Sequence, residues 1–279
     1  MSYSNYQLQL LARMGIDVWT MREVAASESE PAKSSYSNVH ANEPSAIDAD
    51  AMATRSESNF EPNPQTTPPG RPVEGNRIQA SGPSFENDAL VSLEKLKGNV
   101  AGCQLCDLNR SRTNTVFGNG DTDSDWMFIG EAPGKQEDLE GNPFVGRAGK
   151  LLDLMISALG MRREDVYVAN VLKCRPPNNR DPLPSEVDEC EQYLKLQVQL
   201  VKPKVIVALG RISAQLLLKT TMPLGKVRGR IHHYGEHRIP LIATYHPAYL
   251  LRSPDQKAKA WDDLWFARQL VESEIAAKN

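Results

Sequence analysis

The 279-residue sequence has no apolar run long enough to cross a bilayer, and its N-terminus lacks the pattern of a secretory signal peptide. We therefore expect a cytoplasmic protein and exclude membrane-spanning classes. Cysteine is also scarce, with four in the whole chain. In a reducing compartment, four cysteines are more typical of a metal site than of disulfides.

Charge and proline are unevenly distributed along the chain. Residues 27–90 carry a net charge of −6, whereas residues 91–279 carry about +3. Eight of the nineteen prolines lie within residues 27–88, among serine, asparagine and acidic residues with almost no apolar periodicity. This composition predicts a disordered linker over residues 27–88, between a short segment at 1–26 and a folded domain at 89–279. A mildly basic domain is compatible with a polyanionic partner.

The segment at residues 1–26 is too short to form a core of its own, so we expect it to pack on another surface. Its apolar residues fall at helical spacing and end at Gly15, which predicts a short helix followed by an extended stretch. Two interpretations stay open. The segment packs on its own domain, or it binds a partner through Leu11, Ile16 and Trp19, with Trp19 as the anchor.

The rest of the chain has four short apolar runs that predict buried strands, at residues 126–129, 166–171, 205–209 and 239–244. Strands that alternate with helices predict a parallel sheet covered on both faces. The expected fold is therefore α/β, with three αβα layers and a central parallel sheet of four strands. We also expect a helix that opens at Pro184 with Ser185 as its N-cap, and a closing helix near residues 255–276.

A loop rich in glycine and proline follows the first predicted strand, over residues 130–149. In an open α/β sheet, ligands bind at the carboxyl ends of strands. The glycines allow a ligand to approach the backbone, Glu131, Glu137 and Asp138 can supply acid–base chemistry, and Phe144 offers a stacking face. A purely structural junction is the less favoured alternative.

The four cysteines form two separated pairs. Cys103 and Cys106 make a CxxC motif before the sheet, and Cys174 and Cys190 lie beyond the second predicted strand. Four thiolates suit either tetrahedral zinc or an iron–sulfur cluster, and spacing alone does not choose between them. Four free buried thiols are the alternative, which the CxxC motif makes less favoured.

Taken together with the central loop and the cysteines, two further motifs resemble family 4 uracil-DNA glycosylases, from about residue 90 onward. They are Asn170-Val171-Leu172-Lys173-Cys174-Arg175-Pro176-Pro177 and His246-Pro247-Ala248-Tyr249-Leu250-Leu251-Arg252. The resemblance implies an αβα domain that hydrolyses the bond between uracil and deoxyribose in DNA. It also implies a 4Fe–4S cluster whose ligands are Cys103, Cys106, Cys174 and Cys190, which favours iron over zinc.

The resemblance further implies how uracil is bound. Asn170 would read the pairing edge of the base with its amide, and Phe144 would stack on a base taken out of the helix. His246 would bond a uracil oxygen and stabilise the negative charge that develops on the departing base. The backbone around Gly130 and Ala132 would hold the base and position water.

The sequence leaves two candidates for the catalytic carboxylate, because related families place an aspartate at this point. We expect Glu131 to orient the water and keep Glu137 as the alternative. The segment after Asn170 contains no histidine of the kind that traps uracil covalently in one branch of the superfamily. We therefore expect free uracil to be released.

Candidate DNA contacts follow from residue type and position. Basic residues would bind the DNA backbone, and apolar residues after His246 would fill the vacated stack. These candidates are Lys226, Arg228, Arg230, Leu250, Leu251 and Arg252. A solvated surface is an equal alternative for the first three.

Residues 3–24 resemble the N-terminal peptide of the psi subunit of bacterial DNA polymerase III holoenzyme, which binds the chi subunit. The resemblance implies chi as a partner beside uracil-containing DNA, in a bacterial protein that is otherwise a monomer. A second hypothesis follows: a psi-like subunit of the clamp-loader complex whose glycosylase-like domain is not catalytic.

Overall fold

The computed structural model describes residues 5–16 and 92–278, which belong to one compact unit. All of the predicted linker, residues 27–88, and Trp19 lie outside the described residues. Among the helices of the described part, none is long and apolar enough to cross a membrane.

The described residues form a single six-stranded sheet with the order β1-β3-β2-β4-β6-β5. Its four central strands are parallel, which confirms the predicted parallel sheet. Two short antiparallel strands, β1 and β5, extend the edges and were not predicted. The strands are β1 (Asn119–Gly120), β2 (Trp126–Gly130), β3 (Tyr167–Asn170), β4 (Val205–Leu209), β5 (His232–Tyr234) and β6 (Ile239–Thr244).

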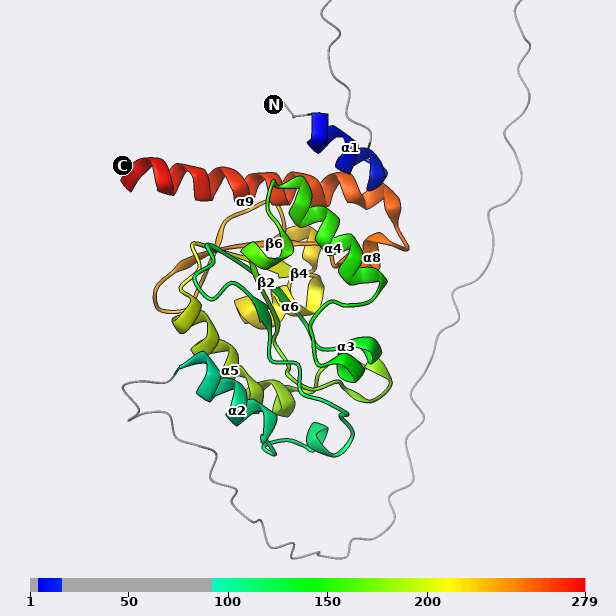
Figure 1. Cartoon of the computed structure of the whole chain (residues 1–279), viewed down its shortest axis with the longest axis vertical. Helices are drawn as coiled ribbons and strands as arrows, with labels where there is room; N and C mark the ends of the chain where they lie inside the picture. The colour runs from blue at the N-terminus through cyan, green and yellow to red at the C-terminus, as the bar shows by residue number, and fades with distance from the viewer. Residues whose placement is uncertain (1–4, 17–91, 279) are drawn as a thin grey trace, which may run out of the picture. The chain divides into compact units, whose positions relative to one another are not determined.

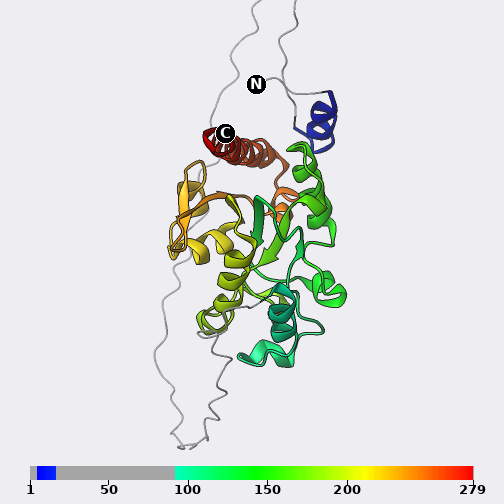
Figure 2. The ribbon, with the colours of Figure 1, turned by 60° about the vertical axis from the view of Figure 1, so that its left-hand side comes forward.

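Helices cover both faces of the sheet, as Figures 1 and 2 show. The α-helices are α1 (Asn5–Arg13), α2 (Leu93–Ala101), α3 (Lys135–Glu140), α4 (Arg147–Ala158), α5 (Pro184–Val201), α6 (Arg211–Leu218), α7 (Leu224–Val227), α8 (Pro247–Leu250) and α9 (Lys257–Lys278). Short 3-10 helices are η2 (Asp107–Arg110), η3 (Arg163–Asp165), η4 (Pro177–Asn179) and η5 (Pro254–Gln256).

The two faces of the sheet have separate hydrophobic cores, because successive strand residues point to opposite faces. Phe128 of β2 packs with α4 and α9 on one face. Its neighbour Ile129 packs with α5 and α6 on the other. The three αβα layers predicted from the sequence are therefore present.

The N-terminus of α5 differs from the prediction. Ser185 lies inside the helix rather than at its cap. The backbone N–H of Leu183 instead donates to the carboxylate of Glu186, at 2.8 Å. Glu186 is buried and also paired with Arg180, and its carboxylate accepts the N–H of the N-cap residue as in a capping box, so the helix begins at Pro184, one residue before Ser185.

Helix α1 is part of the same unit as the sheet. Leu10, Leu11 and Met14 are buried in the core formed by α4 and α9, and the Gln7 amide donates to the carbonyl of Ala158 at 3.2 Å. The helix ends before Gly15, whose φ of +75° suits glycine. The described part of this segment, residues 5–16, therefore packs on its own domain.

Candidate active site

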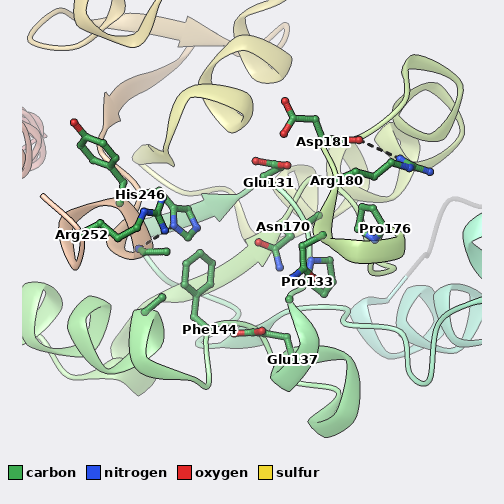
Figure 3. A pocket seen from close by; sticks show the side chains of 16 residues that line it. Glu131, Pro133, Glu137, Phe144, Asn170, Pro176, Arg180, Asp181, His246 and Arg252 are labelled. Atoms are coloured by element: carbon green, nitrogen blue, oxygen red, sulfur yellow. Dashed lines mark hydrogen bonds between the residues drawn. The ribbon is translucent and has the colours of Figure 1, made fainter.

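A cleft of about 490 Å³ opens at the carboxyl ends of β2, β3 and β6 (Figure 3). This is the edge at which an open parallel sheet binds ligands. The cleft brings together residues that lie far apart in the sequence. Its lining includes Glu131, Ala132, Pro133, Gly134, Glu137, Phe144, Ala148, Asn170, Pro176, Asn179, Arg180, Asp181, His246, Ala248, Tyr249 and Arg252.

Asn170 is the last residue of β3 and is only 1% exposed. Its Oδ1 is buried without a hydrogen-bond partner among the described residues. The Nζ of Lys173 donates to its backbone carbonyl at 2.7 Å, which fixes the end of the strand. A buried acceptor without a donor is costly, so this oxygen is arranged for a donor that arrives with a ligand.

Gly130 makes room for this amide. A Cβ at Gly130 would lie 2.3 Å from Asn170 Oδ1 and 2.7 Å from the ring of Phe144. Only a residue without a side chain permits both groups to lie over the end of β2. The structure thus shows that the missing side chain of Gly130 leaves room for Asn170 and Phe144.

Phe144 forms a wall of the cleft in a left-handed backbone conformation, with φ of 55°. Its ring centroid lies 5.5 Å from that of His246, with the two planes at 31°. A Cβ at Gly149 would lie 1.8 Å from the Phe144 carbonyl oxygen, so helix α4 accepts this turn only because it carries glycine there. The exposed part of the ring faces the cleft beside Asn170 (Figure 3).

His246 precedes α8 and caps it, because its Nδ1 accepts a hydrogen bond from the backbone N–H of Ala248 at 3.1 Å. The ring proton of the neutral form is therefore on Nε2. Burial, reinforced by the charge of Arg252, lowers the pKa of His246 to about 4. At neutral pH this side chain is an uncharged hydrogen-bond donor.

Glu131 follows β2 and is half-buried in the cleft. Burial raises its pKa to about 7; the nearby charge of Asp181 adds to this effect and Arg211 opposes it. Asp181 is itself paired with Arg211 at 3.1 Å. Near neutral pH Glu131 can therefore accept a proton, as a group that orients and deprotonates water must.

The two other carboxylates of the loop have structural partners. Glu137 lines the cleft, but its Oε1 accepts the backbone N–H of Val145 at 3.2 Å. Asp138 is buried and accepts the backbone N–H groups of Thr113 and Asn114 at 2.9 and 3.3 Å. Asp138, which was considered for acid–base chemistry, does not line the cleft, and these backbone N–H groups occupy its carboxylate.

Two of the expected DNA contacts have their partners within the domain: Leu250 is buried, and the side chain of Arg228 is 18% exposed. Leu250 is 1% exposed and packs in the core with α4 and α9, so it is not available to fill a vacated base stack. Arg228 forms an ion pair with the buried Asp263 at 3.0 Å and lies over the ring of Tyr245. The expectations that Leu250 fills the vacated stack and that Arg228 binds the DNA backbone are therefore corrected.

The remaining DNA-contact candidates differ in position. Arg252 lines the cleft, whereas Leu251 is partly buried against the core. Lys226 and Arg230 are exposed but do not line the cleft.

The sequence prediction missed one wall of the cleft. Pro176, Asn179, Arg180 and Asp181 line it from the polar loop after β3. That loop was recognisable as polar and follows the carboxyl end of a predicted strand, which is the signal that places it at the ligand-binding edge.

The four cysteines border one small cavity, together with Arg112 and Tyr193. Burial raises the pKa of Cys106, Cys174 and Cys190, so the free thiols are protonated at neutral pH. No three His, Cys, Asp or Glu side chains in the described part of the chain are placed to hold a metal ion as they stand.

Two donors are directed at these sulfur atoms. Arg112 Nη1 donates to Cys174 Sγ at 3.1 Å, and the backbone N–H of Lys173 donates to Cys190 Sγ at 3.3 Å. Hydrogen bonds and positive charge favour thiolates, which are the form that binds metal. The donor set therefore fits a sulfur-ligated metal group.

Comparisons with known proteins identify related sequences. A family model described as the uracil DNA glycosylase superfamily matches residues 117–265. A type-4 uracil-DNA glycosylase of Archaeoglobus fulgidus is 45% identical over 183 residues, which are 62% of this chain and 90% of that protein. One of Thermotoga maritima is 41% identical, over 65% of this chain and 96% of that protein. A type-5 uracil-DNA glycosylase of Pyrobaculum aerophilum is 31% identical, over 47% of this chain and 64% of that protein.

Proposed function

Because the chain belongs to the uracil DNA glycosylase superfamily, we propose that it is a monofunctional uracil-DNA glycosylase that acts in the cytoplasm. It hydrolyses the N-glycosidic bond of uracil in DNA and leaves an abasic site. The observation that carries the proposal is the buried, unpartnered Oδ1 of Asn170 between Phe144 and the backbone at Gly130. A planar base with an N–H donor on its pairing edge satisfies this arrangement.

The Asn170 amide distinguishes uracil from cytosine. Its Oδ1 accepts the N3–H of uracil and its Nδ2 donates to O4. Cytosine presents an acceptor at N3 and a donor at the 4-position, so both contacts would place like groups together. Discrimination of this kind is strong, because the mismatched polar groups would stay buried and unpaired.

Bond cleavage needs charge stabilisation on the base and a nucleophile at the sugar. As the C1′–N1 bond breaks, its electron pair goes to the uracil ring and its negative charge spreads onto O2. Neutral His246 donates its Nε2–H to that oxygen. Water bonds to C1′ and gives its proton to the Glu131 carboxylate, which completes the hydrolysis.

The base reaches this cleft only after it leaves the DNA stack, because the Asn170 amide that reads its pairing edge is buried at the floor of the cleft. Phe144 then stacks on one face of the uracil. Arg252, at the lining of the same cleft, is the basic side chain proposed to bind the DNA backbone there. Lys226 and Arg230 stay candidates for more distant backbone contacts.

We propose that Cys103, Cys106, Cys174 and Cys190 hold a 4Fe–4S cluster. Their shared cavity and the donors from Arg112 and Lys173 support this assignment. When bound, the cluster supplies iron–thiolate bonds that join three separate segments of the chain. Iron and sulfide analysis of the purified protein tests it, and one zinc per chain without iron would contradict it.

The deciding experiment measures uracil release from a uracil-containing oligonucleotide. We expect the Asn170→Ala variant to lose on the order of a hundredfold or more in kcat/KM relative to the wild type. Asn119→Ala, an exposed asparagine on β1, is the matched control and should retain activity. No release by metal-loaded wild type would contradict the proposal and favour a non-catalytic psi-like subunit.

Tethering to chi is a separate proposal, based on the sequence resemblance of residues 3–24. Leu11 and Ile16 are buried in this chain's own core, so a partner that binds them must displace the segment. A pull-down with chi tests it, comparing the full-length protein with one that starts at Ala89. Equal binding by both would remove the basis of the proposal.

A further inference from the structure

The backbone of Phe144 is held in a conformation that side chains rarely adopt. A φ of 55° in a residue with a bulky side chain is strained and persists only where neighbouring groups enforce it. Phe144 is also one wall of the cleft. The groups that enforce its conformation therefore control the shape of the base-binding site.

Two charged side chains hold the residues on either side of Phe144. The carbonyl oxygen of Pro143 accepts a hydrogen bond from Arg163 Nη2 at 3.0 Å. On the other side, Glu137 accepts the N–H of Val145. Phe144 is thus fixed through the peptide groups before and after it.

Arg163 reaches this loop from a different element, because it opens η3 after helix α4. Its side chain is only 25% exposed, and its Nη1 lies 3.8 Å from a carboxylate oxygen of Asp153 on α4. The planar guanidinium can face a carbonyl with one nitrogen and a carboxylate with another. A lysine at this position has a single nitrogen and cannot occupy both places.

We propose that Arg163 is a positioning residue for uracil binding: it holds the Pro143 carbonyl and thereby keeps Phe144 in its stacking position. This inference rests on the proposed function, because stacking on a flipped base gives Phe144 its role. Arg163 does not line the cleft and does not touch the base. Its effect passes entirely through the loop.

The test compares Arg163→Met with Arg162→Met in full-length, metal-loaded protein. Arg162 is the adjacent arginine, is 72% exposed and pairs with Asp165, so the control removes the same charge without touching Pro143. We expect Arg163→Met to lower kcat/KM for uracil release by about tenfold to a hundredfold, mainly through KM. Arg162→Met should change it less than about twofold.

A double-mutant cycle decides whether the effect passes through Phe144. In a Phe144→Ala background, Arg163→Met should lower kcat/KM by less than about twofold, because the side chain that it positions is absent. Equal losses in both backgrounds would overturn the proposal. So would an altered salt dependence of KM in Arg163→Met alone, since that result would indicate a direct phosphate contact.

A structural readout keeps the test independent of activity. Amide hydrogen exchange of residues 144–146 should be faster in Arg163→Met than in Arg162→Met, whether or not the wild type releases uracil. If the wild type releases none but exchange changes as expected, the proposed function fails and the positioning role of Arg163 stands. Unchanged exchange would overturn that role. Arg163→Lys, which keeps the charge, replaces Arg163→Met if the latter does not fold.

Discussion

At the scale of single residues, burial in one cleft has opposite effects on two side chains. It raises the pKa of Glu131 to about 7 and lowers that of His246 to about 4, because it disfavours the charged form of each. Around pH 7 to 8, the result is a carboxylate able to take a proton beside an uncharged imidazole able to donate a hydrogen bond. This pair of states suits a reaction in which negative charge develops on the leaving base.

The raised pKa of Glu131 predicts a pH-dependent stability. Between pH 4.5 and 7 the folded protein keeps a proton that the unfolded chain releases, so this residue makes the fold less stable as pH rises through that window. Glu131→Gln removes the effect. The free energy of unfolding of Glu131→Gln minus that of the wild type should therefore rise by on the order of 1 kcal/mol between pH 5 and pH 8. This value is discounted for the solvent exposure of Glu131. Urea unfolding at both pH values measures it, and a pH-independent difference would contradict it.

Gly130 gives a second residue-scale prediction. Gly130→Ala places a methyl group 2.3 Å from Asn170 Oδ1, so Asn170 or Phe144 must move away from its position. We expect kcat/KM for uracil release to fall by about a hundredfold or more. Gly225→Ala is the matched control, because a Cβ there meets nothing within 4 Å. Equal activities of the two variants would show that the cleft tolerates the displacement.

Some site residues could be identified from the sequence, whereas the contacts of others depend on the fold. Glu131, Phe144, Asn170 and His246 belong to recognisable motifs, and the structure brings all four to one place. Arg228 was misassigned because a basic residue looks the same in sequence whether it faces solvent or a buried carboxylate. Its partner lies on α9, and only the fold brings the two together.

At the scale of secondary structure elements, α1 contributes buried side chains to the core formed with α4 and α9. Leu11 is fully buried there, so Leu11→Ala should lower the free energy of unfolding by about 2–5 kcal/mol. Tyr6→Ala, at a side chain that is 61% exposed on the same helix, should change it by less than about 0.5 kcal/mol. Denaturant unfolding of the two full-length variants measures both. Equal stabilities would mean that α1 is not held on the domain in solution.

The central strands and long helices were predictable because their apolar periodicity is long and strong. The edge strands β1 and β5 were not, because two and three residues are too few to form a pattern. The cap of α5 was missed for a different reason. A serine near a helix start is a good cap by residue type, but the buried Glu186, paired with the half-buried Arg180, accepts the N–H of Leu183 and makes Leu183 the N-cap.

At the scale of the whole molecule, the cysteine site joins the segment before the sheet, the loop after β3 and helix α5. Removal of a bound metal group should therefore lower global stability rather than loosen one loop. We expect chelation under reducing conditions to lower the free energy of unfolding by at least about 3 kcal/mol, the contribution of a ligand at a hundred times its Kd. Calorimetry before and after chelation measures it. An unchanged melting temperature after verified metal loss would contradict the prediction.

The packing of α1 also sets an order of events during synthesis. Its apolar residues rest against Trp261 and Leu264 of α9, the helix that closes the described part of the chain. A ribosome exposes Leu10 and Met14 long before it produces the residues that shelter them. Until then those side chains are open to chaperones and to one another on neighbouring nascent chains. Slow translation near residues 257–271 would lengthen that interval and raise the fraction of new protein lost to aggregation.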